Sequence, residues 1–432
     1  MGSDWNETSP SGLNWWLETI CAPSAWDFNN RFSGITIGIV DDGFDVDHED
    51  LNIDVLNSSV NSKEDHGTHV AGIISAKANN NIGITGIVWN ANLLGVDIEK
   101  TSSQKKQSIQ VSSDDQAFST LLDNGSKIIN FSMGDRNSDL TNEEIKLHSD
   151  YWTWWISYNL QERERNDFII IQAAGNDTRN TRQHGWFCSM DNQSVQAKLD
   201  EWEVTSFTAN DVLDHIIIVG AVEKPNNGYR LTNFSNHGAN ISVVAPGRTI
   251  FSTVVMGGLD GNYKDFFMNG TSQAAPMVTG TAALVWSVNP NFSAAEVKTM
   301  VCEDTGITAQ GYSSDTRTYN MLNAYTSVRK AVQKADSTST SNSISGCVKD
   351  SSNGNVPLSG VTVTVYEGSS ESTAIAATTT NSKGEYFLAL PKGTYNIKYT
   401  KTGYSNGYSN TFTIYSNGYI FEQDTIYLSR IS

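Results

Sequence analysis

Three short apolar runs place the strongest constraint on how this chain can fold. They are Ile35–Val40, Phe168–Ile171 and Ile216–Val219, and each has the length of a strand and is too short for a buried helix. Strands that are apolar on both faces are typical of a parallel sheet that helices cover on both sides. Because helical patterns alternate with these runs over the first three quarters of the chain, we predict an α/β fold with a parallel sheet and helices on both faces.

A polar, low-complexity stretch rich in Ser and Thr marks a change of pattern near residue 340. Beyond it there are no helical periods, and runs such as Val361–Tyr366 and Thr394–Tyr399 alternate apolar with polar residues. A chain of 432 residues is also long enough for two domains. We therefore predict an α/β domain over residues 12–335, a linker over 336–344 and a small all-β, antiparallel sandwich domain over 345–432.

The charge balance argues against two classes of partner. The formal net charge is −18, from 47 acidic and 29 basic residues. Nucleic acid and anionic membrane surfaces both bind a basic face, so we expect neither as a partner. No apolar run reaches the ~18 residues that a membrane-spanning helix needs, so we also expect no membrane span.

The four cysteines are far apart in the sequence and lack the spacing of a metal site. Oxidation of all four would allow three pairings, and the sequence does not choose among them. We expect these residues to be structural or to be unpaired thiols without a chemical role; they are Cys21, Cys188, Cys302 and Cys347.

Three polar residues stand at the ends of predicted elements, and each has an ordinary structural explanation when it is taken alone. Asp41 ends a buried strand and begins an Asp-Asp-Gly sequence that is typical of a turn. His66 stands where a helix is predicted to begin, and a lone histidine is more often structural than catalytic. Ser272 leads into a helix of small residues, where a serine is ordinarily an N-cap.

Taken together, the three residues form a chemically complete set. A serine hydroxyl is a weak nucleophile until an imidazole accepts its proton, and the imidazole needs a carboxylate to fix its tautomer and to stabilise its cation. A parallel sheet gathers such groups at the ends of its strands. We therefore predict that Asp41, His66 and Ser272 are catalytic residues of an enzyme that works by nucleophilic acyl transfer.

The segments DDG at 41–43, HGTHVAG at 66–72 and NGTSQAAP at 269–276 resemble the Asp, His and Ser motifs of the subtilisin family. The three residues also follow that family's chain order, and the resemblance extends over residues 15–335. It implies a serine endopeptidase that acts on a peptide or protein substrate. In that reading the carboxylate is Asp41 rather than Asp42, and the general base is His66 rather than His69, which would be a buried supporting residue.

Two further segments resemble the family's substrate-binding parts. The sequence AAGN at 173–176 resembles its oxyanion-hole motif, which implies that the Asn176 amide stabilises charge on the substrate carbonyl oxygen; the alternative is that Asn176 simply begins a turn. The sequence NFSMG at 130–134 resembles the edge segment that pairs with the substrate backbone. The substrate-binding residues implied by the resemblance are Ser132, Met133 and Gly134 on one wall of the primary side-chain pocket, and Ala174 and Gly175 on the other.

Calcium is the cofactor that the resemblance implies. The segment around Asp50 and the Asn-rich loop at 78–84 resemble parts of the family's tight calcium site. All the implied ligands are hard oxygen donors, and they are the side chains of Asp50 and Asn80 and the carbonyls of Ala78, Ile82 and Ile84. One ligand from the family's N-terminal segment has no clear match, and the alternative is a plain Asn- and Gly-rich loop.

The resemblance also implies how the protein is processed and where it is located. Enzymes of this family are made with an N-terminal propeptide, which we expect to have been removed from a longer precursor. We also expect the protein to be secreted or to stand at the cell surface.

The sequence departs from the family pattern at several places. Gln273 follows the serine where many subtilisins carry methionine. Asp135 and Asp177 follow the two pocket segments, which would favour a basic substrate side chain unless they are ordinary solvated acids. The aromatic run Tyr151–Trp155 lies in a long stretch and either extends a substrate groove or packs a helix against its neighbour; packing is the more common role of such spacing.

The tail resembles the carboxypeptidase regulatory-like, transthyretin-like sandwich domains. The carrying segments are Ser345–Val348, Pro357–Val361, Thr380–Tyr386 and Leu390–Tyr395. Such domains have no chemistry of their own and act as stalks, adhesion modules or stabilisers.

Two other functions remain open from the sequence. A peptide-processing enzyme or macrocyclase would use the same acyl-enzyme with an amine in place of water. A binding protein with a vestigial peptidase fold is the other, and the intact set of Asp41, His66, Asn176 and Ser272 argues against it.

Overall fold

The structure is a computed structural model, and it divides the chain into two compact units. The first comprises Met1–Ala22 and Phe32–Ser327, and the second comprises Pro23–Arg31 and Val328–Ser432. The described residues are 14–32, 34–57, 62–89, 91–98, 111–134, 140–165, 167–225, 228–255, 265–338, 342–368, 374–390, 393–414 and 420–431.

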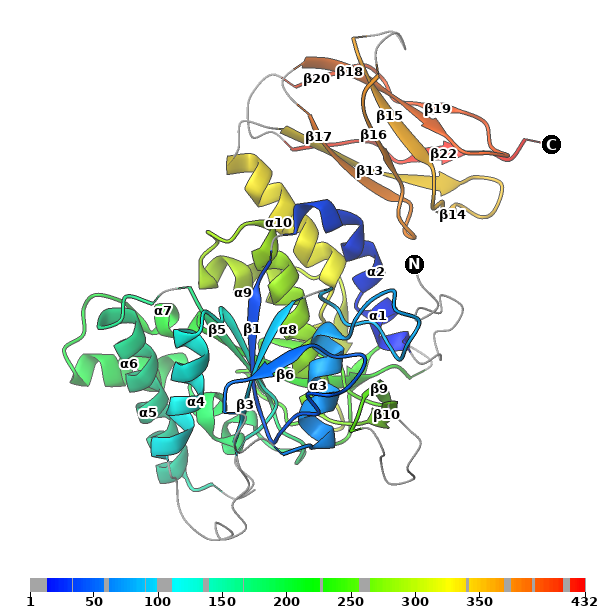
Figure 1. Ribbon diagram of the computed structural model, residues 1–432. Helices are drawn as coiled ribbons and strands as arrows, with labels where there is room; N and C mark the ends of the chain where they lie inside the picture. Colours follow the sequence, from blue (N-terminus) through cyan, green and yellow to red (C-terminus); the bar gives the residue numbers. More distant parts are fainter. Residues whose placement is uncertain are drawn as a thin grey trace. The chain divides into compact units, whose positions relative to one another are not determined.

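A ten-stranded sheet forms the centre of the first unit, and its main part is parallel, as the apolar runs predict (Figure 1). The strand order is β12-β11-β7-β6-β5-β4-β1-β3-β2, with β8 paired to β6. The pairs β6–β7 and β11–β12 are antiparallel, so the sheet changes direction toward that edge. The strands are β1 (Thr36–Asp41), β2 (Ile53–Val55), β3 (Asn92–Asp97), β4 (Ile128–Phe131), β5 (Ile169–Ala173), β6 (Ile216–Glu223), β7 (Arg230–Leu231), β8 (Val243–Pro246), β11 (Thr308–Gln310) and β12 (Thr318–Asn320).

Two consecutive residues of β4 point to opposite faces of this sheet and show that helices cover both faces. Phe131 faces a cluster with Phe118 of α4 (Val111–Asp123), and the two ring centroids are 5.3 Å apart. The neighbouring Asn130 points the other way, where its Oδ1 accepts a hydrogen bond of 2.9 Å from Thr279 of α8 (Thr271–Val288). The α/β class predicted from the sequence is therefore confirmed.

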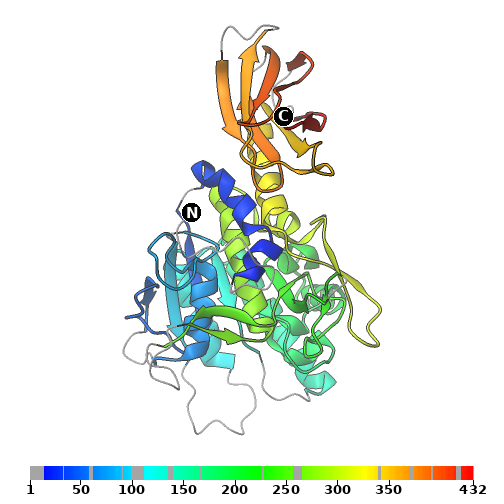
Figure 2. The ribbon, with the colours of Figure 1, turned by 90° about the vertical axis from the view of Figure 1, so that its right-hand side faces the viewer.

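The helices α3 (Asp65–Ser75) and α8 contain two of the predicted site residues, His66 and Ser272. α3 packs against α8 and against β9 (Ile250–Thr253), which pairs with β10 (Asp265–Met268). Figure 2 shows this hairpin beside α3. The hydroxyls of Ser252 and Thr253 donate to the carbonyls of His69 and Thr68, each at 2.8 Å, so β9 fixes the first turns of α3.

Two of the remaining helices of the first unit illustrate how helices in this chain begin. Ser293 caps α9 with a capping box to Glu296, and Thr141 caps α5 in the same way with Glu144. The helices are α1 (Trp15–Thr19), α5 (Asn142–Gln161), η2 (Thr181–His184), η3 (Trp186–Ser189), α6 (Asn192–Glu201), α7 (Ala209–Leu213) and α9 (Ala294–Cys302). Three more, α2 (Ala22–Ala25), η1 (Trp26–Arg31) and α10 (Ala324–Thr338), lie at or across the division between the units.

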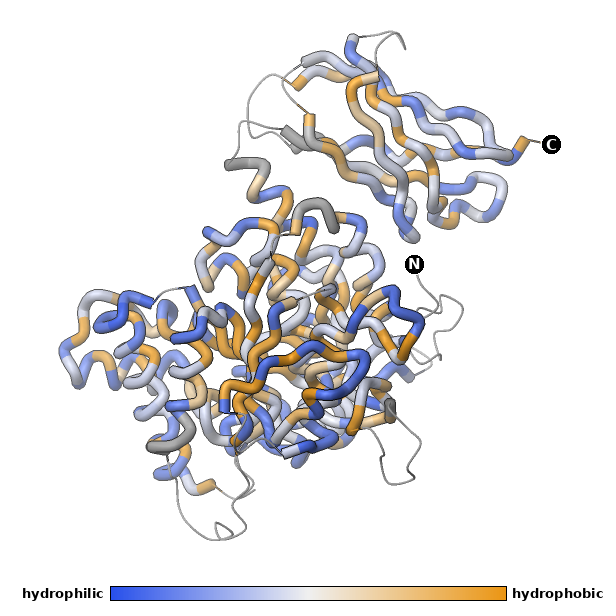
Figure 3. Tube along the Cα trace, viewed as in Figure 1, coloured by the Kyte–Doolittle hydropathy of each residue, from blue (hydrophilic) through white to orange (hydrophobic). Residues whose placement is uncertain are grey.

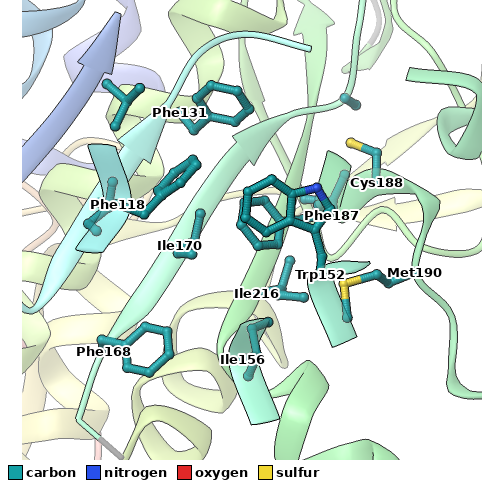
Figure 4. Packing of buried hydrophobic residues seen from close by; sticks show 14 of the residues in the cluster. Phe118, Phe131, Trp152, Ile156, Phe168, Ile170, Phe187, Cys188, Met190 and Ile216 are labelled. Carbon is teal, nitrogen blue, oxygen red and sulfur yellow. The ribbon is translucent and has the colours of Figure 1, made fainter. Parts of the chain in front are cut away.

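A cluster of aromatic rings joins α4, α5 and η3 over the sheet (Figure 4). The Phe118 ring lies edge-on to the rings of Trp152 and Phe187, with centroids 5.6 and 5.4 Å away. Trp152 and Trp155 are buried, whereas Trp154 is 44% exposed. Of the two explanations for the aromatic run on α5, helix packing is the one that Trp152 and Trp155 follow. Figure 3 shows mainly hydrophobic residues along the strands at the centre of the unit.

The second unit contains a small β-sandwich of two five-stranded sheets. Its core includes Ile344, Val363 and Tyr399. Most pairs are antiparallel, but β13 pairs in parallel with both β21 and β22, so the sandwich is not purely antiparallel. The strands are β13 (Asn342–Asp350), β14 (Val356–Pro357), β15 (Thr362–Glu367), β16 (Ala374–Thr379), β17 (Glu385–Leu390), β18 (Gly393–Thr400), β19 (Gly407–Tyr408), β20 (Phe412–Ile414), β21 (Ile420–Glu422) and β22 (Ile426–Leu428).

The linker is shorter than the residues 336–344 that the composition suggests. α10 continues to Thr338, and β13 begins at Asn342. Only 339–341 separate the two elements, and they lie outside the described residues.

Two other expectations can be compared with the structure. All four cysteines lie in the described part of the chain, and no disulfide joins any two of them, so none of the three possible pairings is formed. Among the described residues, no helix combines the length and the apolar character that crossing a membrane requires.

Phe118→Ala is expected to destabilise the first unit by about 3–5 kcal/mol, because it removes a fully buried ring from the centre of the aromatic cluster. The matched control is Trp154→Ala on α5, which removes a larger but exposed ring and is expected to cost less than about 1 kcal/mol. Urea unfolding followed by tryptophan fluorescence measures both. Equal losses in the two variants would contradict this assignment of the core.

Candidate active site

A buried carboxylate and a half-buried imidazole meet where β1 ends and α3 begins. His66 Nδ1–H donates to Asp41 Oδ1 at 2.7 Å, and the backbone N–H of Asp42 donates to the same oxygen at 2.9 Å. Asp41 is fully buried. Burial raises the pKa of Asp41, and the charge and hydrogen bond of His66 oppose that rise, so the pairing favours the ionised carboxylate.

Ser272 lies in the first turn of α8, one residue after Thr271, and the N-cap is Gly270. The serine is therefore inside the helix and is not its cap. The Ser272 hydroxyl donates to the carbonyl of Ser132 at 2.9 Å, and the Ser132 hydroxyl donates back to the carbonyl of Ser272 at 2.9 Å. This reciprocal pair ties the start of α8 to the segment that follows β4.

The Asn176 amide is oriented by the same helix. Its Oδ1 accepts from the backbone N–H of Thr271 at 2.9 Å and from the Thr271 hydroxyl at 3.1 Å. With its oxygen held there, the amide Nδ2 is the group left to face the pocket that Asn176 lines. Gly270 has a φ of 155°, which other residues rarely adopt, and a Cβ at that position would lie 2.9 Å from Gln273 Oε1 and 3.4 Å from Asn176 Nδ2. Glycine thus fits the backbone at the N-cap, next to this amide.

One pocket contains these groups. It is lined by Asp42, His66, Ser132, Met133, Gly134, Asn176, Asp177, His184, Thr271 and Ser272. The sequence prediction named six of these residues as site residues, and its pocket wall of Ser132, Met133 and Gly134 is among them. His184 carries no motif that would have singled it out.

The second predicted wall is arranged differently. Ala174 is buried in the core, and its carbonyl accepts from Asn236 Nδ2 at 2.9 Å. The Gly175 N–H donates to the Thr271 hydroxyl at 3.1 Å, and His184 covers the glycine. Asp177 lines the pocket, whereas Asp135 lies outside the described residues.

His69 is placed as a supporting residue beneath this site. Its Nε2–H faces the carbonyls of Ile250 at 3.0 Å and Phe266 at 3.1 Å. Burial lowers the pKa of His69 to about 3, so the ring stays neutral in the folded protein at pH 7.

The loop after α3 closes around Asp50. The Asp50 carboxylate is fully buried; its Oδ1 accepts from Asn80 Nδ2 at 2.7 Å, and its Oδ2 accepts from the Ile84 N–H at 3.1 Å. Asn80 Oδ1 accepts in turn from the Ile82 N–H at 3.1 Å. The structure therefore brings Asp50, Asn80, Ile82 and Ile84 together, and Ala78 lies in the same loop.

Comparison with known families agrees with this geometry. The model of the subtilase family matches residues 33–340. The chain belongs to the subtilase family. A carboxypeptidase regulatory-like domain matches residues 343–419, which is where the structure has the β-sandwich.

Relatives of this subtilase include enzymes named as peptidases. It is 30% identical to a thermophilic serine proteinase of Bacillus sp. (strain AK1) over 295 residues, which are 66% of this chain and 60% of the relative. It is 28% identical to subtilisin E of Bacillus subtilis (strain 168) over 305 residues, 69% of this chain and 66% of the relative. The chain thus spans three fifths to two thirds of the length of these relatives. A solved protease of Pseudoalteromonas arctica PAMC 21717 is 21% identical, with a TM-score of 0.47 over 76% of this chain and 97% of that one.

The low pKa of His69 predicts that this subtilase loses stability in mild acid. The unfolded chain takes up a proton on this residue near pH 6.5, and the folded protein does so only near pH 3. The free energy of unfolding therefore has its full value, as far as His69 is concerned, above pH 6.5. It decreases as the pH falls, by about 2 kcal/mol at pH 5. Urea unfolding at pH 7.5 and pH 5 measures the loss.

His69→Gln is the matched variant, because its side-chain amide can still donate to the two carbonyls but does not titrate. We expect the difference between the two pH values to shrink by about 2 kcal/mol in this variant. An unchanged pH dependence would show that His69 is not held neutral by burial.

Proposed function

We propose that this subtilase is a serine endopeptidase that cleaves peptide bonds through an acyl-enzyme on Ser272. The observation that carries the proposal is that His66, held at 2.7 Å by the buried Asp41, lines the same pocket as Ser272 and Asn176. In the proposal Ser272 is the nucleophile and His66 is its base. Asp41 orients the base, and the Asn176 amide is a donor for the developing charge.

Each residue has a defined part in the proposed reaction. The Ser272 oxygen attacks the substrate carbonyl carbon as its proton passes to His66 Nε2, and the hydroxyl leaves its bond to the Ser132 carbonyl to do so. Asp41 keeps the His66 Nδ1–H in place and stabilises the imidazolium. His66 then gives the proton to the departing amine, and water, activated by the same imidazole, releases the acyl group.

The negative charge of the tetrahedral intermediate is stabilised by donors that are already in place. Asn176 Nδ2 faces the pocket because Thr271 holds its oxygen. Ser272 lies in the first turn of an 18-residue helix, whose partly positive N-terminus is directed at the same place. The Ser132–Gly134 segment borders the pocket and is proposed to pair with the substrate backbone as an added strand.

Ser272→Ala and His66→Ala are each expected to reduce peptide hydrolysis by about 10⁶-fold, because the residues act as a unit; this magnitude was measured in subtilisin, a member of the same family. Hydrolysis of a fluorogenic peptide library, with products read by mass spectrometry, measures the loss. Activity that persists in Ser272→Ala would refute the proposal.

Asn176→Asp tests the catalytic part of the Asn176 N–H donor apart from the structural part of its side-chain oxygen. The variant keeps an oxygen to accept from Thr271 but lacks the N–H donor, and we expect kcat to fall by about 10²–10³, again a magnitude known from subtilisin. KM is expected to change little, since the interaction forms in the transition state.

We also propose that calcium binds at the Asp50 loop. The donor types fit the ion, since the loop offers one carboxylate, one side-chain amide and backbone carbonyls. Two neutral donors, the Asn80 side-chain amide and the Ile84 backbone N–H, contact the Asp50 carboxylate, so its oxygens are gathered inside the loop. Asn80 Nδ2 faces Asp50, so the amide has to turn its oxygen toward the carboxylate when the ion binds.

Excess EDTA is expected to lower the melting temperature of the calcium-loaded protein. A ligand that binds only the folded state stabilises it by about 2.7 kcal/mol when its free concentration is about 100 times Kd. Asp50→Asn is the control, because it keeps the size of the side chain and removes its charge; it should melt lower and no longer respond to EDTA. Equal responses to EDTA in both proteins would place the calcium elsewhere.

The location of the enzyme and its maturation stay predictions. Release to the cell exterior and removal of a propeptide are both expected from the resemblance to the family.

A further inference from the structure

The imidazole of His184 fills the space between two glycines at the site. A Cβ placed on Gly134 would lie 2.1 Å from His184 Nε2, and a Cβ placed on Gly175 would lie 2.3 Å from Asn236 Nδ2 and 2.6 Å from His184 Nδ1. These contacts are closer than side-chain carbons approach other atoms, so the ring occupies the volume in front of Gly134 and shares the volume in front of Gly175 with Asn236. Gly134 lies two residues after Ser132, whose carbonyl accepts a hydrogen bond from Ser272, and Gly175 directly precedes Asn176.

The chain on both sides of His184 is fixed, so the ring is held in this place. Before it, the Thr181 N–H donates to the carbonyl of His237 at 2.9 Å, and the Arg182 side chain forms an ion pair with Asp191 at 2.6 Å. After it, Trp186 stacks on Trp152, with ring centroids 5.2 Å apart and planes within 20°. The segment carrying His184 is therefore anchored in the aromatic core.

The chemistry of the site shows which part of a substrate meets this ring. His66 has to reach the departing amine, so the leaving half of the peptide lies on the His66 side of Ser272. The residue that supplies the attacked carbonyl then lies on the opposite side. Its side chain branches from the Cα bonded to that carbonyl carbon, so it has to be accommodated by the part of the lining that Met133, Gly134 and His184 form.

We propose that His184 determines specificity by closing this side-chain pocket, so that the enzyme cleaves after glycine, alanine or serine and rejects large side chains such as phenylalanine and leucine. The proposal rests on the endopeptidase function proposed above. A large side chain would have to displace an imidazole whose neighbours are packed into the core. The remaining lining gives it little apolar surface, because Met133 is the one large apolar residue among the pocket's described lining.

Peptides that differ only in the residue before the scissile bond test the proposal. With alanine and phenylalanine at that position, we expect kcat/KM of the wild type to favour alanine by about 100-fold or more, a factor within the range of steric selection. His184→Ala is expected to reduce that ratio by at least about 10-fold, mainly by raising kcat/KM for phenylalanine. Gln183→Ala, on the same short helix but outside the pocket lining, is the control and should keep the wild-type ratio.

The outcomes separate this inference from the function on which it rests. Equal cleavage after phenylalanine and alanine by the wild type, or an unchanged ratio in His184→Ala, would overturn the inference and leave the endopeptidase intact. Failure to cleave any peptide would overturn both.

A second measurement does not depend on activity. Gly134→Ala is expected to lower the melting temperature of the wild type, because the new methyl group meets His184. In the His184→Ala background the same substitution should lower it much less, since the obstructing ring is gone. Equal effects in the two backgrounds would show that the imidazole does not lie against Gly134 and would overturn the inference.

Discussion

The burial of one carboxylate explains how closely the elements around the site approach each other. Asp41 is fully buried at the end of β1, and a charge in that position is costly unless donors surround it. His66 and the Asp42 N–H supply them, which requires α3 to begin directly against the strand. Gly67 permits that approach, since a Cβ there would lie 2.2 Å from the Gly43 carbonyl oxygen and 3.1 Å from Asp41 Cβ.

The segment between β5 and β6 connects the core to the substrate pocket. Gln172 of β5 is fully buried; its Nε2 donates to the Met133 carbonyl at 3.1 Å, and its Oε1 accepts from the Cys188 N–H at 3.0 Å. One side chain thus holds both the Ser132–Gly134 segment and the segment between β5 and β6. Because Trp186 of the latter segment packs on the core and His184 lines the pocket, stability and the proposed specificity depend on the same stretch of chain.

The parts that the sequence predicts well are those determined by local pattern. The apolar strands follow from composition over a few residues, and the residues that are proposed to be catalytic stand in long motifs. The position of His184 depends instead on how an irregular segment packs over long range, for which the sequence offers no periodic signal. The parallel pairing of β13 with β21 is likewise a choice of strand direction that alternation of apolar and polar residues does not determine. The polar composition after Ala335 suits a linker and the end of a helix equally well, so composition does not show that α10 continues to Thr338.

Covalent labelling tests most directly whether Asp41, His66 and Ser272 work as one nucleophilic unit. A fluorophosphonate reacts with an activated serine, and mass spectrometry of the digested protein locates the adduct. The account predicts a single adduct on Ser272 in the wild type, and labelling that is strongly slowed in His66→Ala because the hydroxyl has lost its base. An adduct on another residue, or equally fast labelling in the wild type and His66→Ala, would contradict the account.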